Sequence, residues 1–426
     1  MKTVIKGGRV IDPASSIDKK ADVVFKSDRI IEIAGPKTEY PRSMNVIDAA
    51  GCIVMPGLID LHTHLREPGF EQKETIATGC MAAVSGGFTS ICCMANTNPV
   101  NDNISVTGLI LDKALAAKTA RVFPIACMTV EMNGDHLVEM GELRQAGVVA
   151  FSDDGKSIMS SAIMRNALVY AKMFGAPIAV HEIDLEIAGK GAMHKGFHSV
   201  KLGLPGVPSA AEDIMIARDA ILAKDTGGRV HFLHVTTKGA IDIIRDYKSK
   251  GVSITAEVTP HHFTLIDEDV GDYNTQYKMS PPLRGPSDRE ALINGLKDGT
   301  IDAIATDHAP HEILAKDCEF ENAANGIIGL ETALALTWNL VRRKQLTPRR
   351  AVELLTWGPA KCYNLPTGTI SPGSLADLTI FDPKVKYIFD ADRIYSKSKN
   401  SPFIGAKMQG QVKTTIVGGK TVFSRN

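Results

Sequence analysis

The central part of the chain alternates short apolar runs with amphipathic stretches of helical length. This alternation is typical of repeated strand–helix units whose strands form a parallel sheet. Eight apolar runs can be counted, at residues 58–64, 89–94, 122–128, 148–152, 177–181, 230–235, 253–258 and 302–306. Because eight such repeats close a (β/α)8 TIM barrel, the pattern predicts this α/β fold for residues 56–366.

The two ends of the chain have a different pattern, with β-branched strands flanking Gly-Gly pairs. Residues 4–11 and 415–423 each look like a β-hairpin that turns on its two glycines. Further strands are indicated at residues 21–25, 29–33 and 376–381. We therefore predict a small β-sandwich domain built jointly from residues 1–55 and 367–426.

Composition narrows the class of partner. The 426 residues are 44% hydrophobic and 23% charged, with a formal net charge of zero. The sequence contains no block of Lys and Arg that would bind nucleic acid or an anionic membrane electrostatically, so we expect a small-molecule substrate or a protein partner. No apolar run reaches the roughly 18 residues that span a bilayer, and Gly7 and Gly8 interrupt the start before a signal-like segment develops, which predicts a cytoplasmic protein. The seven cysteines include no CxxC pair and are interpreted as reduced core residues.

The end of the first apolar run carries two histidines, His62 and His64. Side chains alternate along a strand, so these two imidazoles project from the same face. One of them could be an ordinary core histidine and the other a loop residue. The paired spacing at a strand end, next to Arg66 and Glu67, favours a metal site instead.

Polar, metal-competent residues also follow the other runs. They are Asn96 after the second run, Asp153 and Asp154 after the fourth, His181 and Glu182 after the fifth, His234 after the sixth, and Asp307 and His308 after the eighth. The carboxyl ends of barrel strands share one rim, where active sites of this architecture lie. Histidines with carboxylates form a typical zinc ligand set, and their number is sufficient for two ions.

The remaining histidines are weaker candidates. His231 lies three residues before His234, so a regular strand would turn it toward the helices in a structural role. His261 and His262 follow the seventh run and are possible but less favoured ligands. Polar surroundings indicate surface or loop positions for His136, His194 and His198.

Five segments together carry a family resemblance. They are PGLIDLHTHLREPG at 56–69, MANTNP at 94–99, FSDDG at 151–155, VTPHH at 258–262 and TDHAPH at 306–311. This combination resembles the amidohydrolase superfamily and, within it, the type I dihydroorotases. The resemblance extends over almost the whole chain, and the segments HLREPG and FSDDG are the ones most specific to the type I dihydroorotases.

The resemblance implies a ligand set and a reaction. His62, His64 and Asp307 would hold one zinc ion, His181 and His234 a second, and Asp154 would lie between them; occupancy by one or two ions is open. The implied reaction is the reversible cyclisation of N-carbamoyl-L-aspartate to L-dihydroorotate in pyrimidine biosynthesis, with Asp307 as ligand and general base.

One position separates this family from its relatives. Hydantoinases, dihydropyrimidinases and allantoinases bridge their metals with a carboxylated lysine, whereas this chain offers Asp153 and Asp154. A carboxylate already carries the charge that lysine gains only by reacting with carbon dioxide. The resemblance implies that the second aspartate, Asp154, is the bridging ligand and not Asp153, and Lys156 lies past Gly155 in the loop.

The substrate carries carboxylates, and a guanidinium binds such a group with two parallel hydrogen bonds. We therefore predict that Arg66 binds a substrate carboxylate. Alternatively, Arg66 could pair with Glu67 at the surface, and Asn96 could form an Asx turn. By resemblance His64, Asn96 and His311 are further substrate contacts. Two positions depart from the family pattern. Ser280 stands where relatives commonly carry asparagine, and Asn325-Gly326 differs from the family's sequence in the loop at about 312–327. This loop could act as a lid. We expect the Asn325 and Gly326 backbone, and Ser280 directly or through water, to contact the substrate.

Two other functions stay open at this stage. The chain could be another cyclic amidase of the hydantoinase or allantoinase type, which the missing lysine and Arg66 disfavour. It could also be a non-catalytic subunit that scaffolds aspartate transcarbamoylase, although such homologues typically lose metal histidines that this chain retains. An active enzyme could also need that partner, and we expect a homo-oligomer, namely a dimer.

Overall fold

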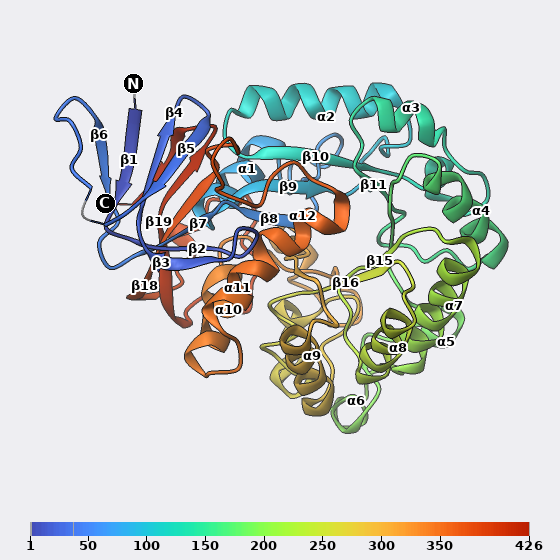
Figure 1. Cartoon of the computed structure of the whole chain (residues 1–426). Helices are drawn as coiled ribbons and strands as arrows, with labels where there is room; N and C mark the ends of the chain where they lie inside the picture. Colours follow the sequence, from blue (N-terminus) through green and yellow to red (C-terminus); the bar gives the residue numbers. More distant parts are fainter. Residues whose placement is uncertain (1, 37, 426) are drawn as a thin grey trace.

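The computed structural model describes residues 2–36 and 38–425, and an eight-stranded parallel sheet forms its centre (Figure 1). Each predicted apolar run overlaps one strand, and the strands are neighbours in chain order. They are β8 (Leu58–Thr63), β9 (Phe88–Cys93), β10 (Arg121–Ala126), β11 (Ala150–Phe151), β12 (Ile178–Val180), β15 (Val230–Phe232), β16 (Ile254–Val258) and β17 (Ala303–Ile304). The predicted fold class is therefore confirmed.

The first and last strands of the barrel are joined through Asp60. Its Oδ2 accepts a hydrogen bond from the Thr306 hydroxyl at 2.6 Å, and its Oδ1 accepts from the Thr306 amide at 3.0 Å. A parallel bridge between Thr63 and His308 continues the contact toward the rim. These bonds close the barrel and bring the segment that bears His62 beside the segment that bears Asp307.

Helices surround the barrel (Figure 1). In chain order they are α1 (Ile76–Ser85), α2 (Ile104–Ala117), α3 (Met140–Gln145), α4 (Ser161–Lys172), α5 (Leu185–Ala188), α6 (Phe197–Leu202), α7 (Ala210–Thr226), α8 (Lys238–Ser249), α9 (Pro286–Asp298), α10 (Ala333–Arg342), α11 (Pro348–Leu355) and α12 (Trp357–Tyr363). Tyr363 of α12 packs among apolar residues of the barrel interior, including Leu61 of β8 and Leu233 just after β15. In the part of the chain that the structure describes, no helix is long and apolar enough to cross a membrane.

Strands from both ends of the chain form two further sheets beside the barrel (Figure 1). The first sheet contains β1 (Lys2–Lys6), β4 (Asp22–Lys26), β5 (Arg29–Ala34) and β6 (Asn45–Asp48). The second contains β2 (Arg9–Asp12), β3 (Ile17–Lys20), β7 (Ile53–Pro56), β18 (Leu378–Ile388), β19 (Lys407–Val417) and β20 (Lys420–Ser424). A pair of very short strands, β13 (Met193–His194) and β14 (Gly206–Val207), lies outside these sheets.

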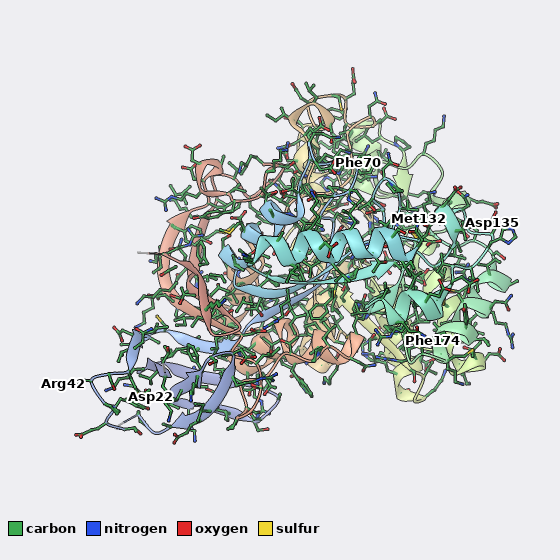
Figure 2. All side chains as sticks on the ribbon, turned by 90° about the horizontal axis from the view of Figure 1, so that it is seen from above. Asp22, Arg42, Phe70, Met132, Asp135 and Phe174 are labelled. Atoms are coloured by element: carbon green, nitrogen blue, oxygen red, sulfur yellow. The ribbon has the colours of Figure 1, made fainter. Side chains whose placement is uncertain are left out.

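The two terminal sheets share one apolar core. Ile5 and Val23 of the first sheet pack in the same buried cluster as Val10, Ile380 and Ile416 of the second. This is the arrangement of a β-sandwich, in which each sheet buries one face against the other. Seen from above, Asp22 and Arg42 mark the N-terminal strands at one end of the molecule, and Met132 and Asp135 mark the other end (Figure 2).

The two Gly-Gly pairs behave differently. At the C-terminal pair, β19 and β20 form the predicted antiparallel hairpin. The predicted hairpin at Gly7-Gly8 is wrong, because β1 and β2 belong to different sheets. Gly7 has a φ of +83° and donates to Asp22, while a side chain at Gly8 would meet Val54 at 2.6 Å, so these glycines let the chain cross between the two sheets.

The cysteines follow the prediction with one exception. All seven are free thiols, and six of them are buried. Cys318 is exposed, because it lies in the loop after β17 rather than in an apolar element.

Candidate metal centre

Three buried ligands meet at the carboxyl end of β8. The Nε2 atoms of His62 and His64 each lie 3.4 Å from Oδ2 of Asp154. All three ligand atoms lie within 4.8 Å of one another. One metal ion with ordinary bond lengths of about 2 Å can bridge such a set.

A second group of ligands shares the same aspartate. Oδ1 of Asp154 lies 3.4 Å from Nδ1 of His181 and 3.5 Å from Nε2 of His234. The two ring nitrogens of His181 and His234 are only 2.9 Å apart. Each oxygen of Asp154 therefore belongs to one group, which is the geometry of a carboxylate that bridges two neighbouring ions.

The neighbouring residues Asp153 and Lys156 point elsewhere. Oδ1 of Asp153 accepts hydrogen bonds from the Met128 and Thr129 amides at 2.7 and 3.1 Å. The Nζ atom of Lys156 donates to the carbonyl of Met132 at 2.9 Å. Between the two aspartates of the FSDDG segment, the structure thus places Asp154 in the cluster and Asp153 in a loop-stabilising role.

The residues of both groups fit a bound cation. His62 Nε2 and Asp154 Oδ1 are buried, and neither has a hydrogen-bond partner within residues 2–36 and 38–425. Leaving a buried polar atom unpaired costs about 1–3 kcal/mol, which a coordinated cation would offset. Imidazole nitrogens with carboxylate oxygens form the donor set that zinc takes in catalytic sites.

The charges at the centre hold its carboxylates ionised. Burial raises the pKa of Asp154, but the charge of His62 and the contacts with His181 and His234 outweigh it and hold this pKa well below its usual range. The pKa of Asp307 is lowered in the same way, against burial, by His62 and His64. Both groups can therefore act as anions at neutral pH.

Two side chains orient the HxH histidines. Oε1 of Glu257 lies 2.9 Å from Nδ1 of His62, and Oδ1 of Asn96 lies 2.9 Å from Nδ1 of His64. An acceptor at Nδ1 favours the tautomer that leaves Nε2 free to coordinate a metal. Sequence reasoning missed Glu257, although an acidic residue inside the seventh apolar run was a usable signal.

The orientation predicted for His231 is wrong. Its Nε2 lies 3.1 Å from Oε2 of Glu257 and its Nδ1 lies 2.8 Å from the Thr255 hydroxyl, so it points into the barrel beneath the histidines and not toward the helices. The alternation rule fails because β15 ends at Phe232 and the backbone of His234 has a φ of +30°. The positive φ lets both His231 and His234 face the interior.

Asp307 completes the rim. Its Oδ1 lies 3.1 Å from Nε2 of His64 and 3.5 Å from Nε2 of His62. Its backbone has a φ of +47°, a conformation that a non-glycine residue rarely adopts and that often marks functional sites. Asp307 is therefore near the first ligand group, within reach of both HxH histidines.

A cavity of about 240 Å³ opens beside the ligands. It is lined by His64, Arg66, Asn96, Asp154, Gly155, His181, His234, Ser280, Asp307, Ala309, His311, Asn325 and Gly326. All seven residues predicted to bind substrate are in this lining, and His62 alone among the predicted site residues lies outside it. The structure thus brings the predicted ligands and contacts to one place.

Arg66 and His311 form one wall of the cavity. Nε of Arg66 donates to the Pro310 carbonyl at 3.3 Å, and Nη2 lies 3.4 Å from Nε2 of His311. Burial lowers the pKa of Arg66 to about 10, so the guanidinium stays charged at neutral pH. Neither Arg66 nor His311 pairs with a carboxylate in the described chain, and burial together with the charge of Arg66 lowers the pKa of His311 to about 3. The positive charge that this wall offers to an acidic ligand is therefore that of Arg66.

The loop at about 312–327 contains one short 3-10 turn, η4 (Ile313–Ala315), and is fastened at several points. Lys316 is buried and donates to the carbonyls of Thr275 and Lys278 at 3.1 and 3.0 Å. Lys278 in turn donates to the Glu321 carbonyl at 2.7 Å. These bonds hold the loop in the position where Asn325 and Gly326 line the cavity.

The other histidines stay outside the ligand groups. His262 bonds to Thr259 and to the carbonyl of Pro281, while His261 is buried with an unpaired Nε2 among the described residues. His136 is exposed, and His194 and His198 are half-buried.

Comparison with known proteins places the chain in a family. The Amidohydrolase family matches residues 53–422, which include every ligand and cavity residue described above. The chain belongs to the amidohydrolase family. Among solved structures, this amidohydrolase is similar to the L-hydantoinase (dihydropyrimidinase) from Arthrobacter aurescens, with a TM-score of 0.89, 24% identity and coverage of 100% of this chain and 96% of that one.

Curated relatives of this amidohydrolase are more similar in sequence. The dihydroorotase of Anaeromyxobacter sp. (strain K) is 52% identical over 420 residues, covering 98% of this chain and 97% of the relative. The dihydroorotase of Geotalea daltonii (strain DSM 22248 / JCM 15807 / FRC-32) is 50% identical over 426 residues and the whole of both chains.

Proposed function

We propose that this amidohydrolase is a dihydroorotase, which cyclises N-carbamoyl-L-aspartate reversibly to L-dihydroorotate. The observation that carries the proposal is a carboxylate, Asp154, shared by two histidine groups beside a cavity whose wall bears the guanidinium of Arg66, which forms an ion pair with no carboxylate of the described residues. The first feature suits amide chemistry, and the second suits a cyclic amide that also carries a carboxylate. The full-length dihydroorotase relatives at about 50% identity support it.

We further propose zinc as the metal, with one or two ions. His62, His64 and Asp307 would hold one ion, His181 and His234 the other, and Asp154 both. When bound, zinc supplies a Lewis acid that polarises the scissile carbonyl and lowers the pKa of water. Glu257 and Asn96 keep the two HxH rings in the orientation that this requires.

Asp307 is the proposed general base. In the hydrolytic direction it accepts a proton from the water that attacks the ring carbonyl and gives this proton to the departing ring nitrogen. In the biosynthetic direction it takes the proton from the carbamoyl nitrogen and passes it to the departing hydroxyl of the protonated carboxyl group, which leaves as water. Its lowered pKa keeps Asp307 deprotonated at neutral pH, which is the state that a base needs before it can accept a proton.

The cavity wall is the proposed site for the substrate carboxylate. Arg66 offers two parallel donors, and Asn96 and His311 lie beside it. The shorter Ser280 side chain and the backbone of Asn325 and Gly326 face the same space. We propose that these groups contact the ring or its carboxylate, with Ser280 acting directly or through water.

A hydantoinase-type function has less support. The fold is shared with hydantoinases, but at 24% identity this similarity concerns the fold alone. Lys156 donates to Met132 and does not reach the ligand groups, so a bridging carboxylated lysine has no candidate there. A purely scaffolding role is disfavoured because both ligand groups are complete. Association with aspartate transcarbamoylase, a dimeric state and a cytoplasmic location stay predictions.

The test combines metal analysis with activity. Purified protein should bind zinc and turn over L-dihydroorotate, with much weaker activity on hydantoin and dihydrouracil, both with and without added aspartate transcarbamoylase. Asp307→Asn should lower kcat by about 10²–10⁴-fold, the usual contribution of a general base. Metal-free protein that is inactive under every condition would leave only the scaffold role, and near-normal turnover by Asp307→Asn would remove it as the base.

A further inference from the structure

A segment of the C-terminal part of the chain reaches the rim of the cavity. Residues 396–400, here called the bridging segment, follow β18 and precede β19, so they belong to the strands of the β-sandwich by sequence. Its last residue, Asn400, is 5% exposed and does not line the cavity itself. Nothing in the local sequence marks it as functional.

Every hydrogen-bonding group of the Asn400 side chain contacts the rim backbone. Its Oδ1 accepts from the His311 amide at 2.9 Å. Its Nδ2 donates to the carbonyls of Ala309 and Gly326 at 2.9 and 3.1 Å. The buried amide of Asn400 thus links the segment after β17, at Ala309 and His311, to the C-terminal end of the 312–327 loop, at Gly326. All three of these residues line the cavity.

The bridging segment is itself fixed to the loop that carries Arg66. Glu74 accepts hydrogen bonds from the Ser396 hydroxyl and from the Lys397 amide, and the Ser398 hydroxyl donates to the Lys73 carbonyl at 2.6 Å. Glu74 also lies 3.3 Å from Nε2 of His308. The segment therefore links the loop after β8 with the loop after β17, which bear Arg66 and His311 respectively.

We propose that Asn400 is a positioning residue that sets the affinity for the substrate's carboxylate by holding His311 and Gly326 in register with Arg66. The inference rests on the function proposed above. Asn400 touches neither the ligand groups nor the reacting atoms, so it acts on binding of the ground state and the transition state alike. Such uniform binding appears in KM and leaves kcat nearly unchanged.

The direct test is Asn400→Asp, which keeps the shape and the Oδ1 acceptor but places an anionic oxygen against two carbonyls. We expect KM for L-dihydroorotate to rise about 10-fold or more while kcat and bound zinc stay within about twofold. Amide hydrogen exchange should quicken at Ala309, at His311 and at residues 325–328. Asn400→Ser, which is neutral and too short to span the rim, serves as the second variant if the aspartate protein does not fold.

Ser401→Ala is the matched control, because the hydroxyl of the adjacent Ser401 is also buried but, among the described residues, accepts a hydrogen bond only from the Phe403 amide. Its KM should stay at the wild-type value. The double variant with His311→Ala should show less than the product of the two single effects, since both changes act on the same wall. Wild-type protein without dihydroorotase activity would refute the proposed function, whereas active wild type with an unchanged KM in both Asn400 variants would overturn this inference alone.

Discussion

The carboxylate of Glu257 connects two histidines inside the barrel, with His62 Nδ1 at 2.9 Å from one oxygen and His231 Nε2 at 3.1 Å from the other. Glu257 is fully buried, and its pKa is lowered to about 2 because the contacts with His231 and His62 outweigh burial. Glu257 therefore stays ionised and accepts a hydrogen bond from Nδ1 of His62, the ring nitrogen that does not belong to the ligand group. This places an anion behind the ligand, where it raises the basicity of the coordinating nitrogen.

Glu257→Gln should weaken metal binding without unfolding the protein. The glutamine keeps the volume but removes the charge behind His62, and loss of such a partner typically lowers metal affinity 10–100-fold. Competition with a chelator measures this directly. Asp12→Asn is the matched control, since Asp12 is equally buried but lies in β2, and its metal affinity should not change. Equal affinity in wild type and Glu257→Gln would show that the hydrogen bond does not influence the centre.

The two aspartates of the FSDDG segment should differ sharply on substitution. Asp154→Asn removes the anion that both ligand groups share, so bound metal should fall toward zero at both positions. Asp153→Asn disturbs only hydrogen bonds from Thr129 and Met128, so it should lower stability and leave metal stoichiometry intact. Elemental analysis of the two purified variants separates these outcomes. Loss of metal from the Asp153 variant alone would reverse the assignment.

Much of the centre could be predicted because its determinants are local or follow from the barrel's symmetry. The spacing of His62 and His64 requires a common face, and parallel strands bring their carboxyl ends to one rim whatever the sequence separation. This rule brings Asp153, Asp154 and Asp307 to the rim, whereas the preference for Asp154 over Asp153 came from the family resemblance. The boundary of the predicted domains at residues 55 and 56 falls within β7, and the division itself stays a prediction.

Other features depend on contacts that the sequence does not reveal. The positive φ of His234 breaks the strand alternation, so the direction of His231 could not be read from spacing. Gly7-Gly8 has the same sequence as the Gly418-Gly419 pair, which does form a hairpin. Only the contacts of Gly7 with Asp22 and of Gly8 with Val54 show that the first pair lets the chain cross between sheets. Asn400 lies far along the chain from His311 and has no motif around it.

Arg66→Lys should impair binding of the acidic substrate selectively. A lysine keeps the charge but cannot form two parallel hydrogen bonds with a carboxylate. Losing a charged hydrogen bond of about 1.5–3 kcal/mol predicts a rise in KM for L-dihydroorotate of about 10–100-fold. The weak activity on dihydrouracil, which lacks the carboxylate, should change little. Arg121→Lys is the control, because Arg121 pairs with Asp377 outside the cavity; a parallel loss on both substrates would argue against carboxylate recognition by Arg66.

Lys316 should give the protein a pH-dependent stability. Burial, assisted by the nearby charge of Lys278, lowers the pKa of Lys316 to about 7, and its Nζ faces only carbonyl oxygens. The unfolded lysine keeps its usual pKa of about 10.4, so between these values the unfolded state binds the extra proton. Stability therefore rises with pH across this window, by at most about 1.4 kcal/mol per pH unit from this group, and the penalty is fully present below pH 7.

Replacing the buried ammonium removes this dependence. Lys316→Met should be more stable than wild type near pH 6.5, and the difference should shrink steadily toward pH 10, as measured by urea denaturation at a series of pH values. The substitution also deletes two hydrogen bonds that fasten the 312–327 loop, so a constant offset between the curves is expected on top of the changing difference. Lys420→Met, at an exposed position in β20, should run parallel to wild type throughout. Parallel curves for Lys316→Met and wild type would mean that Lys316 is not held in its neutral form.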